Sequence, residues 1–549
     1  MANIKFPRKE FEKALGTKIT KDIEEKINML GTPLENLTSQ EIEIEIFPNR
    51  PDLLSMQRYV QALKTFIGLQ KSTKKIKIVS PQKNYKVTID KSVKQVRPHT
   101  VCAVVKNLKL TEEKIIDLVN FQEKLHSTLG RNRKKVAIGI YPLEKIKLPI
   151  RYEARKPSEI KFIPLESKRE MNAQQILRSH PKGKQYSSLL KGQSKYPVFI
   201  DANNKILSMP PIINSQETGK ITTDTKEIFV ECSGNDVQTL SKTLNILIAT
   251  LVEMNGQIYS MKINDDKTTI TPNLETQEIK VSLENINKTL GLELKESQLH
   301  SLFSKMEHSY NSNKKTVNVP AWRTDILHEV DLIEDIAIAY GYQNFIPELP
   351  EVCTIGEESK ISKLQAKISE TLIGLQMLET SSYHLIKKEE AKKAKLKNKI
   401  ELEDSKTDYK ILRPNLLIPT LRTLSENVDT DYPQNIFEIG RVFSKGSKVN
   451  SETRIKENDK LIVAITPGNF TEIKQILDYL VSHLGLEYSL QETEKVGFIE
   501  GRTGKISLKE TKEEIGYLGE VHPETLRKWH LKMPLAILEI NLDKIYDKI

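Results

Sequence analysis

The amino-acid sequence predicts a multidomain α+β protein, and three observations lead to this prediction. The chain has 549 residues, a length typical of about three or four domains. Hydrophobic residues make up 38% of it, which is enough for several packed cores and excludes a disordered chain. Short runs with strand periodicity alternate with helical runs along the chain, as an α+β fold requires.

Composition limits where such a protein works. No apolar run approaches the length that spans a bilayer, and the first residues contain no signal-peptide core, so we expect a cytoplasmic protein and no membrane partner. Cys102, Cys232 and Cys353 lie far apart without a CxxC spacing, which indicates reduced core residues. The net charge of +11 fits a nucleic-acid partner, although a lysine-rich composition is also a solubility feature.

The N-terminal segment predicts a helix followed by a strand and a turn. Apolar residues spaced four apart indicate a helix within residues 1 to 30. These residues are Phe11, Leu15, Ile19, Ile23 and Ile27. Strict alternation from Glu41 to Ile46 predicts a half-buried strand. In the following FPNRPDLLS, the prolines favour a rigid, structural turn at residues 49–52, and Asp52 is expected to begin a helix that Gly68 ends.

Residues from about 80 to 255 indicate a larger α+β region. A helix is predicted from Thr111 to Leu129. The β-rich runs are His99 to Val105, Lys135 to Ile140, Pro197 to Ile200 and Glu227 to Val230.

Two stretches of this region suggest either binding or plain structure. GRNRKKVAIGIY places Arg131, Arg133, Lys134 and Lys135 just before a strand, where they would contact phosphate or simply form the mouth of a charged hairpin. SMPPIINSQ, residues 208–216, places a double proline beside Asn214 and Ser215, where it would line a pocket or form an ordinary turn.

Four carboxylates form the most unusual pattern, in VPAWRTDILHEVDLIEDIAIAYGYQNFIPELP. A helix is predicted from Asp331 onward, with Gly341 as its C-cap, and Asp331, Glu334 and Asp335 would share one face. Asp325 precedes this helix and could fold back over the same face. At about 5.5 Å and an effective dielectric near 20, each pair costs roughly 3 kcal/mol. Solvent, a basic partner or a hard cation must offset this repulsion.

The C-terminal region begins with helical periodicity after Ile355. The run from Lys387 to Lys399 is strongly charged and indicates an exposed helix or an insertion. From Tyr409 strands and helices alternate, and NIFEIGRVF, from Asn435 to Phe443, predicts a buried strand. No GxxxxGK[ST], GxGxxG, GxSxG or HExxH motif occurs, so generic motifs identify no enzyme.

Taken together, these stretches resemble the beta subunit of phenylalanyl-tRNA synthetase in its archaeal and eukaryotic-cytosolic form. FPNRPDLLS is similar to the N-terminal signature of the family, and LGRNRKKVAIGIY, ILRSHPKGKQY and LSMPPIIN are similar to its editing domain. VPAWRTDILHEVDLIEDIAIAYGY resembles its most specific motif, and NIFEIGRVF and IGYLGEVHPETL resemble its C-terminal region. The resemblance covers nearly the whole chain in the family's order.

The resemblance implies four domains. They are an N-terminal α/β domain (1–80), an editing domain (81–270), a small helical-β, B5-like metal-binding domain (271–350), and a C-terminal class II synthetase-like antiparallel-sheet domain without catalysis (351–549). A class II core needs a late glycine-rich motif that ends in an ATP-holding arginine, and nothing after Ile355 supplies one. We therefore expect Arg413 and Arg422 to support the fold and the subunit interface.

The implied enzyme is an (αβ)2 tetramer that joins phenylalanine to tRNA(Phe) with ATP, with the synthetic active site on the alpha subunit. In the family, the acidic helix carries a Mg²⁺ site shared with the alpha subunit. Its matching residues here are Asp325, Asp331, Glu334 and Asp335.

The resemblance also implies hydrolysis of mischarged Tyr-tRNA(Phe). Tyrosine is phenylalanine with an added hydroxyl, and an apolar pocket rejects that group only about a hundredfold. The candidate editing residues are Asn214, Ser215, Thr225 and Glu231, whose alternative roles are turn hydrogen bonds and a strand-end acid. ECSGND departs from the family's EVTGTD-like pattern, which leaves open a non-catalytic subunit for assembly and tRNA binding, with a decayed editing site.

Overall fold

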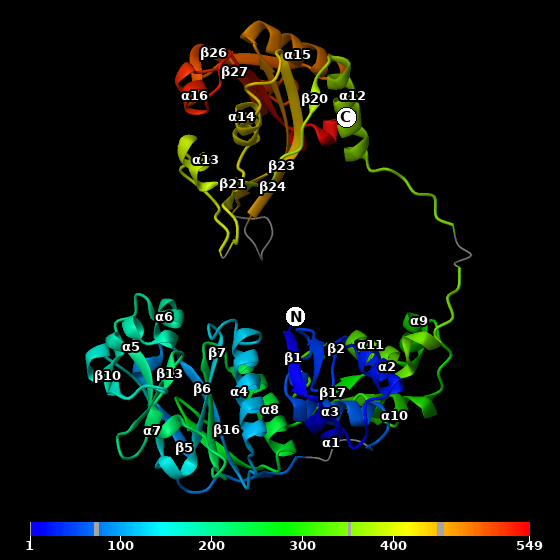
Figure 1. Ribbon diagram of the computed structural model, residues 1–549. Coiled ribbons are helices and arrows are strands. Elements are labelled where there is room, and N and C mark those ends of the chain that lie inside the picture. The colour runs from blue at the N-terminus through cyan, green and yellow to red at the C-terminus, as the bar shows by residue number, and fades with distance from the viewer. Residues whose placement is uncertain (1, 71–75, 350–352, 404, 447–454, 549) are drawn as a thin grey trace. The chain divides into compact units, whose positions relative to one another are not determined.

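The computed structural model describes residues 2–70, 76–349, 353–403, 405–446 and 455–548 of the chain (Figure 1). It divides into two units, Met1–Glu348 and Leu349–Ile549. Both contain sheets covered by helices, which confirms the multidomain α+β fold class. No helix in the described ranges is long and apolar enough to cross a membrane.

The first unit begins with a three-stranded antiparallel sheet in the order β1-β3-β2. Its strands are β1 (Ala2–Pro7), β2 (Leu34–Leu37) and β3 (Glu41–Ile46). The prediction for β3 is confirmed, because Ile42, Ile44 and Ile46 are buried. The prediction of one N-terminal helix is wrong at its start, since residues 2–7 form a strand that pairs with β3.

The helical part of that segment is broken in two, into α1 (Arg8–Leu15) and α2 (Lys21–Met29). Gly16 ends α1 with a left-handed φ of +84°, a conformation that a glycine adopts without strain. The five apolar residues spaced four apart are all buried nevertheless. Their spacing identified the core face correctly but gave no sign of the break.

The turn after β3 leads into α3 (Met56–Phe66). Pro51–Leu53 forms a separate 3-10 turn, so Asp52 does not begin the helix as expected. Ser55 is the N-cap, with its hydroxyl accepting the N–H of Arg58. The Asp52 carboxylate instead receives the Arg50 guanidinium at 2.9 Å and 3.0 Å.

A large sheet forms the middle of the first unit, with its main strands in the order β13-β12-β11-β8-β5-β15-β6-β14-β7. Most neighbours are antiparallel, but β5 pairs in parallel with β8 and β15, and β4 with β15. The strands are β4 (Ile78–Val79), β5 (Lys86–Ile89), β6 (His99–Lys106), β7 (Val136–Pro142), β8 (Ile150–Arg155), β11 (Tyr196–Ile200), β12 (Ile206–Met209), β13 (Ile213–Asn214), β14 (Ile228–Gly234), β15 (Gln257–Asn264) and β16 (Thr268–Thr271).

The central strands of this sheet are buried on both faces. On β6, Val101 and Val105 pack into the core beneath the helices α4 (Glu112–Ser127) and α8 (Val237–Glu253), while Cys102 and Val104 belong to the core of the opposite face. The four predicted β-rich runs and the predicted helix of this region all occur, with ends shifted by a few residues. A small lobe of short elements adjoins β11–β13 around its own core. Its elements are β9 (Lys161–Phe162), β10 (Met171–Asn172), α5 (Ala173–Ser179), α6 (Pro181–Tyr186) and α7 (Gln216–Gly219).

The last part of the first unit is a three-stranded sheet, β17-β19-β18, with three helices. Its elements are β17 (Gln277–Lys280), α9 (Leu283–Leu290), α10 (Glu296–Lys305), β18 (Ser309–Asn311), β19 (Thr316–Val319) and α11 (Glu329–Tyr340). The predicted acidic helix is α11, which begins two residues earlier than expected and ends at Gly341 as expected. Leu332, Ile333 and Ile336 anchor it in the core.

The second unit is built on a seven-stranded sheet, β20-β23-β24-β28-β27-β26-β25, in which only β20 is parallel to its neighbour. Helices α12 and α15 pack on one face, and α14 and α16 on the other (Figure 1). The elements are α12 (Lys360–Gly374), β20 (Leu378–Glu379), β21 (Leu385–Lys387), α13 (Lys388–Lys393), β22 (Tyr409–Leu412), α14 (Leu417–Glu426), β23 (Gln434–Lys445), β24 (Ile455–Thr466), α15 (Phe470–His483), β25 (Tyr488–Glu492), β26 (Phe498–Leu508), β27 (Glu514–Val521), α16 (Pro523–Lys528) and β28 (Ala536–Asn541).

The structure also tests the predictions for the strand at NIFEIGRVF and for the three cysteines. The strand predicted at NIFEIGRVF is part of β23, which pairs with β24 along its whole length. Cys353 is exposed and so lies outside any core, contrary to expectation, because it belongs to the irregular segment before α12; Cys102 and Cys232 are buried free thiols, as expected.

Candidate functional sites

The first candidate site lies on the large sheet, where β14 holds Glu231 between two neighbouring strands. Glu231 is opposite Cys102 of β6 and Gly139 of β7, and only 2% of its surface is exposed. Gly139 is required at this position, since a Cβ there would lie 2.4 Å from Glu231 Oε1 and 2.2 Å from Tyr141 Oη. The backbone of β7 thus makes room for a buried polar cluster.

Tyr141 connects the members of this cluster. Its hydroxyl donates to Ser208 Oγ at 2.8 Å, and it lies 3.2 Å from Glu231 Oε1 and 3.5 Å from Asn214 Oδ1. Glu231 Oε2 is buried and has no hydrogen-bond partner within the described part of the chain. A buried polar atom without a partner costs free energy, so the cluster has an unused capacity to bind a polar group.

Burial controls the protonation of Glu231. It raises the pKa of the carboxyl to about 8, even though the positive charge of Arg97 acts in the opposite direction. The carboxyl is therefore mostly neutral at pH 7. A neutral carboxyl both donates and accepts hydrogen bonds, and this suits it to hold a hydroxyl group.

The structure brings together only two of the four residues predicted for editing. Glu231 and Asn214 both contact Tyr141, whereas Ser215 and Thr225 make turn hydrogen bonds. Ser215 Oγ caps α7 by accepting the N–H of Glu217, and Thr225 Oγ1 accepts the N–H of Thr222 at 3.1 Å. For these two, the turn interpretation describes the observed contacts.

Sequence reasoning missed Tyr141 and Ser208, although both lie within the stretches that were singled out. Residues 139 and 141 of one strand share a face, so strand alternation could have placed Tyr141 beside Gly139. Only the pairing of β7 with β14, however, puts Tyr141 next to Glu231. The link to Ser208 comes from β12, which lies toward the other end of the strand order and far along the chain.

Of the four basic residues before β7, one is buried and hydrogen-bonded within the chain, and three are exposed. Arg133 is buried, donates to the carbonyl oxygen of Ile212 at 2.9 Å, and lies over the ring of Tyr186 with its guanidinium carbon 4.4 Å from the centroid. It therefore fixes the double-proline turn and is not available to phosphate. Arg131, Lys134 and Lys135 are exposed.

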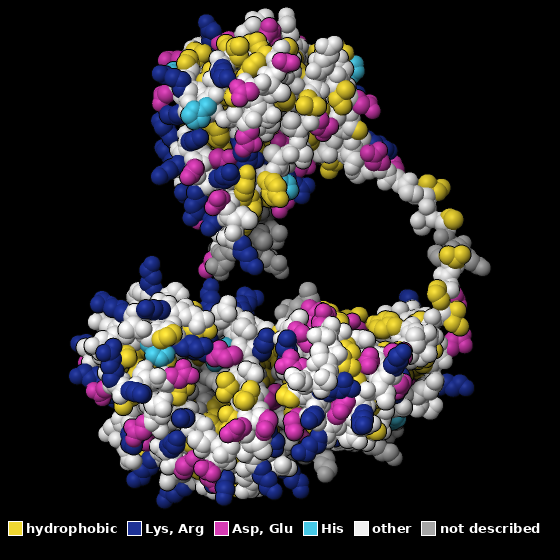
Figure 2. Space-filling model, in the orientation of Figure 1, with side chains coloured by type: hydrophobic (Ala, Val, Ile, Leu, Met, Phe, Trp, Pro, Cys, Tyr) yellow, Lys and Arg dark blue, Asp and Glu magenta, His cyan; other side chains and the backbone are white. Residues whose placement is uncertain are grey.

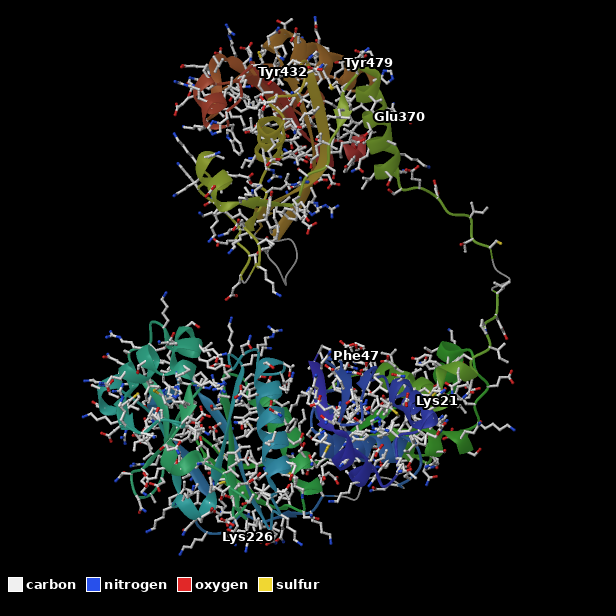
Figure 3. The ribbon with its side chains drawn as sticks, in the orientation of Figure 1. Lys21, Phe47, Lys226, Glu370, Tyr432 and Tyr479 are labelled. Carbon is white, nitrogen blue, oxygen red and sulfur yellow. The ribbon has the colours of Figure 1, made fainter. Side chains whose placement is uncertain are left out.

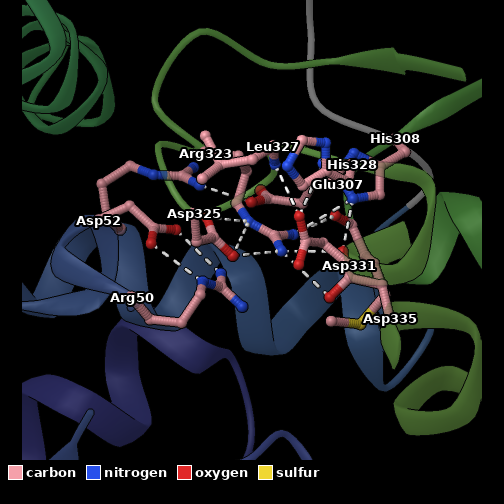
Figure 4. A network of polar contacts seen from close by, with 12 residues as sticks. Arg50, Asp52, Glu307, His308, Arg323, Asp325, Leu327, His328, Asp331 and Asp335 are labelled. Atoms are coloured by element: carbon pink, nitrogen blue, oxygen red, sulfur yellow. Dashed lines mark hydrogen bonds and ion pairs between the residues drawn. The ribbon is translucent and has the colours of Figure 1, made fainter. Parts of the chain in front are cut away.

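The second candidate site is the acidic cluster at α11 (Figure 4). Arg323 lies at its centre, with Nη2 donating to Asp325 Oδ2 and to Asp335 Oδ2, each at 2.8 Å. His308 Nε2 lies 2.6 Å from the same Asp335 oxygen. Burial alone would raise the pKa of Asp335, but Arg323 and His308 lower it to about 2.

The other two carboxylates are placed differently. Asp331 Oδ2 accepts the backbone N–H groups of Leu327 and His328, at 2.7 Å and 2.8 Å, so it caps the helix. Glu334 is exposed. Among the described residues, no three His, Cys, Asp or Glu side chains are grouped closely enough to hold a metal ion.

All four carboxylates nevertheless line one cleft of about 670 Å³ between α11 and the N-terminal segment. Phe47, labelled in Figure 3, and Arg50 belong to its opposite wall. Within this cleft Arg323 is the basic partner that offsets the predicted repulsion for Asp325 and Asp335. Mg²⁺ binds a few carboxylates and keeps several waters, so the donor types in this cleft suit it. Arg323 already pairs with Asp325 and Asp335, however, and the described residues alone do not form a complete metal site.

In the second unit, both singled-out arginines form ion pairs within the chain. Arg413 is buried and donates to Glu438 Oε1 at 2.6 Å and to Ser382 Oγ at 2.8 Å. Arg422 donates to Glu390 at 3.2 Å. These contacts agree with the expected support of the fold.

Comparisons with known proteins point to one family. Family models match the chain as a B3/4 domain (residues 82–249), a tRNA synthetase B5 domain (279–342) and a phenylalanyl tRNA synthetase beta chain CLM domain (346–542). These are domains of an aminoacyl-tRNA synthetase.

Curated relatives agree over nearly the full length. The phenylalanine–tRNA ligase beta subunit of Archaeoglobus fulgidus is 35% identical over 535 residues, 95% of each chain, and that of Thermococcus sibiricus is 36% identical over 507 residues, 91% of this chain and 90% of the relative. An N-terminal fragment of the phenylalanyl-tRNA synthetase beta subunit from Pyrococcus horikoshii is 34% identical with a TM-score of 0.59; the match covers 62% of this chain and 99% of the fragment. The chain belongs to the family of phenylalanine–tRNA ligase beta subunits.

Proposed function

We propose that this chain is the beta subunit of a cytoplasmic phenylalanine–tRNA ligase, which works with an alpha subunit in an (αβ)2 tetramer to attach phenylalanine to tRNA(Phe) at the expense of ATP. The observation that carries this proposal is the match to named relatives along 95% of both chains. The alpha subunit would contain the synthetic active site. Within the described second unit, the buried pairing of Arg413 with Glu438 supports a structural role for the class II-like core.

The proposed division of labour follows the four domains expected from the sequence. Residues 1–80 and 271–350 would form the acidic cleft toward the partner chain, residues 81–270 would edit, and residues 351–549 would be the non-catalytic core. This chain offers the alpha subunit an apolar docking surface beside the cleft, because Leu327 and Val330, next to Glu334, are 59% and 58% exposed.

Purification of the tagged chain from its native cell tests this proposal. We expect a second, smaller synthetase-like chain to co-elute, and the eluate to charge tRNA with phenylalanine and with no other amino acid. If the chain elutes alone and charges nothing, the proposed function is wrong.

The proposal extends to hydrolysis of Tyr-tRNA(Phe) at the Glu231 cluster. A buried, mostly neutral carboxyl with one unused oxygen would bind the phenol of tyrosine, while phenylalanine would leave that oxygen unpaired. Asn214, at the edge of the cluster, would help to orient the ester, and Ser215 and Thr225 would shape the surrounding turns. The attacking water would be positioned by these polar groups.

Variants of the assembled enzyme test editing separately from charging. Glu231→Ala and Asn214→Ala should leave charging with phenylalanine unchanged while Tyr-tRNA(Phe) accumulates. Glu217→Ala, an exposed neighbour on α7, is the matched control and should edit normally. Normal deacylation by both site variants would contradict the editing assignment and favour the non-catalytic subunit instead.

Mg²⁺ bound by Asp325, Asp331, Glu334 and Asp335, and shared with the alpha subunit, completes the proposal. Bound there, the ion would join the two subunits electrostatically. Because Arg323 holds Asp325 and Asp335, we expect weak binding by the free chain and tighter binding in the assembly. The melting temperature with and without Mg²⁺ checks this, with Glu334→Gln expected to abolish the difference; an intact, fully stable tetramer after chelation would contradict it.

A further inference from the structure

The second unit has a strongly basic face around α13, formed by the charged run that the sequence analysis singled out. Five exposed lysines occur within eight residues: Lys392, Lys393, Lys395, Lys397 and Lys399. Figure 2 shows Lys and Arg side chains gathered along the edge of this unit, which in Figure 1 carries α13 and α16. We call these five lysines, together with Tyr383, the α13 face.

Acidic side chains offset the positive charge of this face only in part, because Glu524 interacts electrostatically with Lys395 and Glu401 with Lys399, in neither case as an ion pair. Glu390 is buried and pairs with Arg422, and Glu401 pairs with Lys388. Within the described ranges, none of the five lysines of the face forms an ion pair. Clustered like charges repel each other, so an anionic partner would relieve this repulsion.

An exposed aromatic ring lies over β22, one of the two strands against which α13 packs. Tyr383 is 72% exposed and stacks on Tyr409, with ring centroids 5.7 Å apart and an interplanar angle of 29°. Tyr409 is itself held by cations, with Lys387 Nζ 5.1 Å and the Arg422 guanidinium 5.3 Å from its ring centroid. An exposed aromatic ring close to cations is a combination that binds unpaired bases and phosphates.

The face also has a concave part. Lys393 and Lys395 border a cleft of about 730 Å³, with Lys528 of α16 among its other lining residues. Lys393 Nζ lies 5.3 Å from the centroid of the Trp529 ring, which fixes one of these cations at the cleft. The cleft is also lined by Glu494, Glu500 and Glu524, and Glu524 pairs with Lys528, so the cations available to a phosphate chain are those of Lys393 and Lys395 at its border.

We propose that the α13 face binds tRNA, with its lysines on the sugar-phosphate backbone and Tyr383 stacked on an unpaired base. The inference rests on the proposed function and deepens it, because it assigns a tRNA-contacting surface to the unit that has no expected catalysis. Phosphate contacts supply affinity and little sequence information, so this face increases affinity for tRNA generally.

The test compares two sets of three lysines in the enzyme assembled with its partner chain. The first set is Lys392→Gln, Lys395→Gln and Lys397→Gln. The matched control removes the same charge from α12, on the other side of the same unit, as Lys360→Gln, Lys363→Gln and Lys367→Gln. The dissociation constant for tRNA(Phe) is measured between 50 and 300 mM KCl, and charging at saturating tRNA is measured in parallel.

We expect the α13 set to weaken binding at least about tenfold at 0.1 M salt and to reduce the slope of log K against log salt by about two, because three phosphate contacts are lost. The control set should change neither quantity. Charging at saturating tRNA should be unchanged in both. Tyr383→Ala should weaken binding about fivefold or more, and Tyr383→Phe, which keeps the stacking ring, should bind like the wild type.

Two results would overturn the inference. If the α13 set binds tRNA with the wild-type affinity and salt slope while the wild-type enzyme charges normally, the face does not bind tRNA and the proposed function still stands. If tRNA binding is unchanged but less partner chain is recovered with the α13 set, the face belongs to a protein interface. A wild-type enzyme that neither charges nor binds tRNA would refute the proposed function itself.

Discussion

Two buried carboxyls in the first unit behave in opposite ways. Glu231 on the large sheet and Asp335 on α11 have exposed fractions of 2% and 4%. Burial raises the pKa of Glu231 to about 8, whereas the pKa of Asp335 falls to about 2 despite its burial. The difference is that Asp335 directly contacts a guanidinium and Glu231 does not.

This difference indicates what each region is suited to do. The Asp335 carboxylate is paired with a cation and joins separate segments of the chain, since Arg323 also holds Asp325 and the Arg50–Asp52 pair lies next to it (Figure 4). Nearby, His308 Nδ1 and Glu307 Oε1 have no hydrogen-bond partner among the described residues. The Glu231 region keeps a polar atom without a partner at a cost in stability. A buried acid without a charged partner is typical of a binding site, whereas a buried acid paired with a guanidinium is typical of a structural contact between segments.

Removal of Arg323 should cause the largest loss of stability among the changes considered for these two regions. Arg323→Met would leave Asp325 and Asp335 without their cation, and loss of one partner of a buried pair costs about 3–5 kcal/mol of the free energy of unfolding. Urea denaturation of the assembled protein measures this loss. Arg8→Met, at a partly exposed pair with Glu12, is the control and should cost less than about 1 kcal/mol.

A second change separates charge from packing in that prediction. Arg323→Met combined with Asp335→Asn should recover part of the lost stability, because the uncompensated charge is then removed. Equal stability of Arg323→Met and Arg8→Met would show that the buried cluster contributes no more than a surface pair.

The pH dependence of stability should report Glu231. Its pKa is about 8 in the folded state and about 4.5 in the unfolded state, so the folded state retains a proton that the unfolded state loses between these values. This group therefore lowers stability as pH rises from 4.5 to 8, by about 4 kcal/mol between pH 5 and pH 8, and has little effect below that window.

Glu231→Gln should remove this contribution, so that the variant matches the wild type near pH 5 and is more stable near pH 8. Chemical denaturation at several pH values measures it. Glu227→Gln, four residues earlier and paired with Lys106 near the surface, should leave the pH profile unchanged. Wild-type and Glu231→Gln profiles that run parallel from pH 5 to pH 8 would mean that Glu231 is ionised in the folded protein.

Tyr141→Phe should lower the free energy of unfolding by less than Arg323→Met and should also change the pKa of Glu231. It removes the hydroxyl that reaches Ser208 and Glu231, which leaves buried polar atoms unpaired and costs about 2 kcal/mol. That hydroxyl also helps to lower the pKa of Glu231, so the pKa should rise further in the variant. Carboxyl chemical shifts followed through a pH titration measure this change, and a fall in the pKa would contradict it.

Asp331→Ala should have the smallest effect, because Asp331 is only partly buried and acts as a helix cap. Loss of its hydrogen bonds to the N–H groups of Leu327 and His328 should cost about 1 kcal/mol. Asp331→Asn, which still accepts these bonds, should cost less. A loss as large as that of Arg323→Met would show that Asp331 belongs to the buried cluster.

The sequence alone predicted much of the local structure. Alternation predicted β3, and the acidic helix and its end at Gly341 followed from apolar spacing and capping. The prediction of one continuous N-terminal helix failed at Gly16, where the chain changes direction, because the four-residue spacing of apolar residues persists across two helices joined by a turn.

The pairing of the strands and the packing of helices and strands within the first unit decided the chemistry of the sites. Glu231, Asn214 and four carboxylates were identifiable from motifs, but Tyr141 and Arg323 became their partners only through contacts fixed by folding. A motif specifies which groups are present, and each pKa depends on the desolvation and the neighbouring charges that tertiary structure supplies. For this reason the sequence determined the family and the acidic residues, and only the fold decided that one buried acid is paired and the other is open.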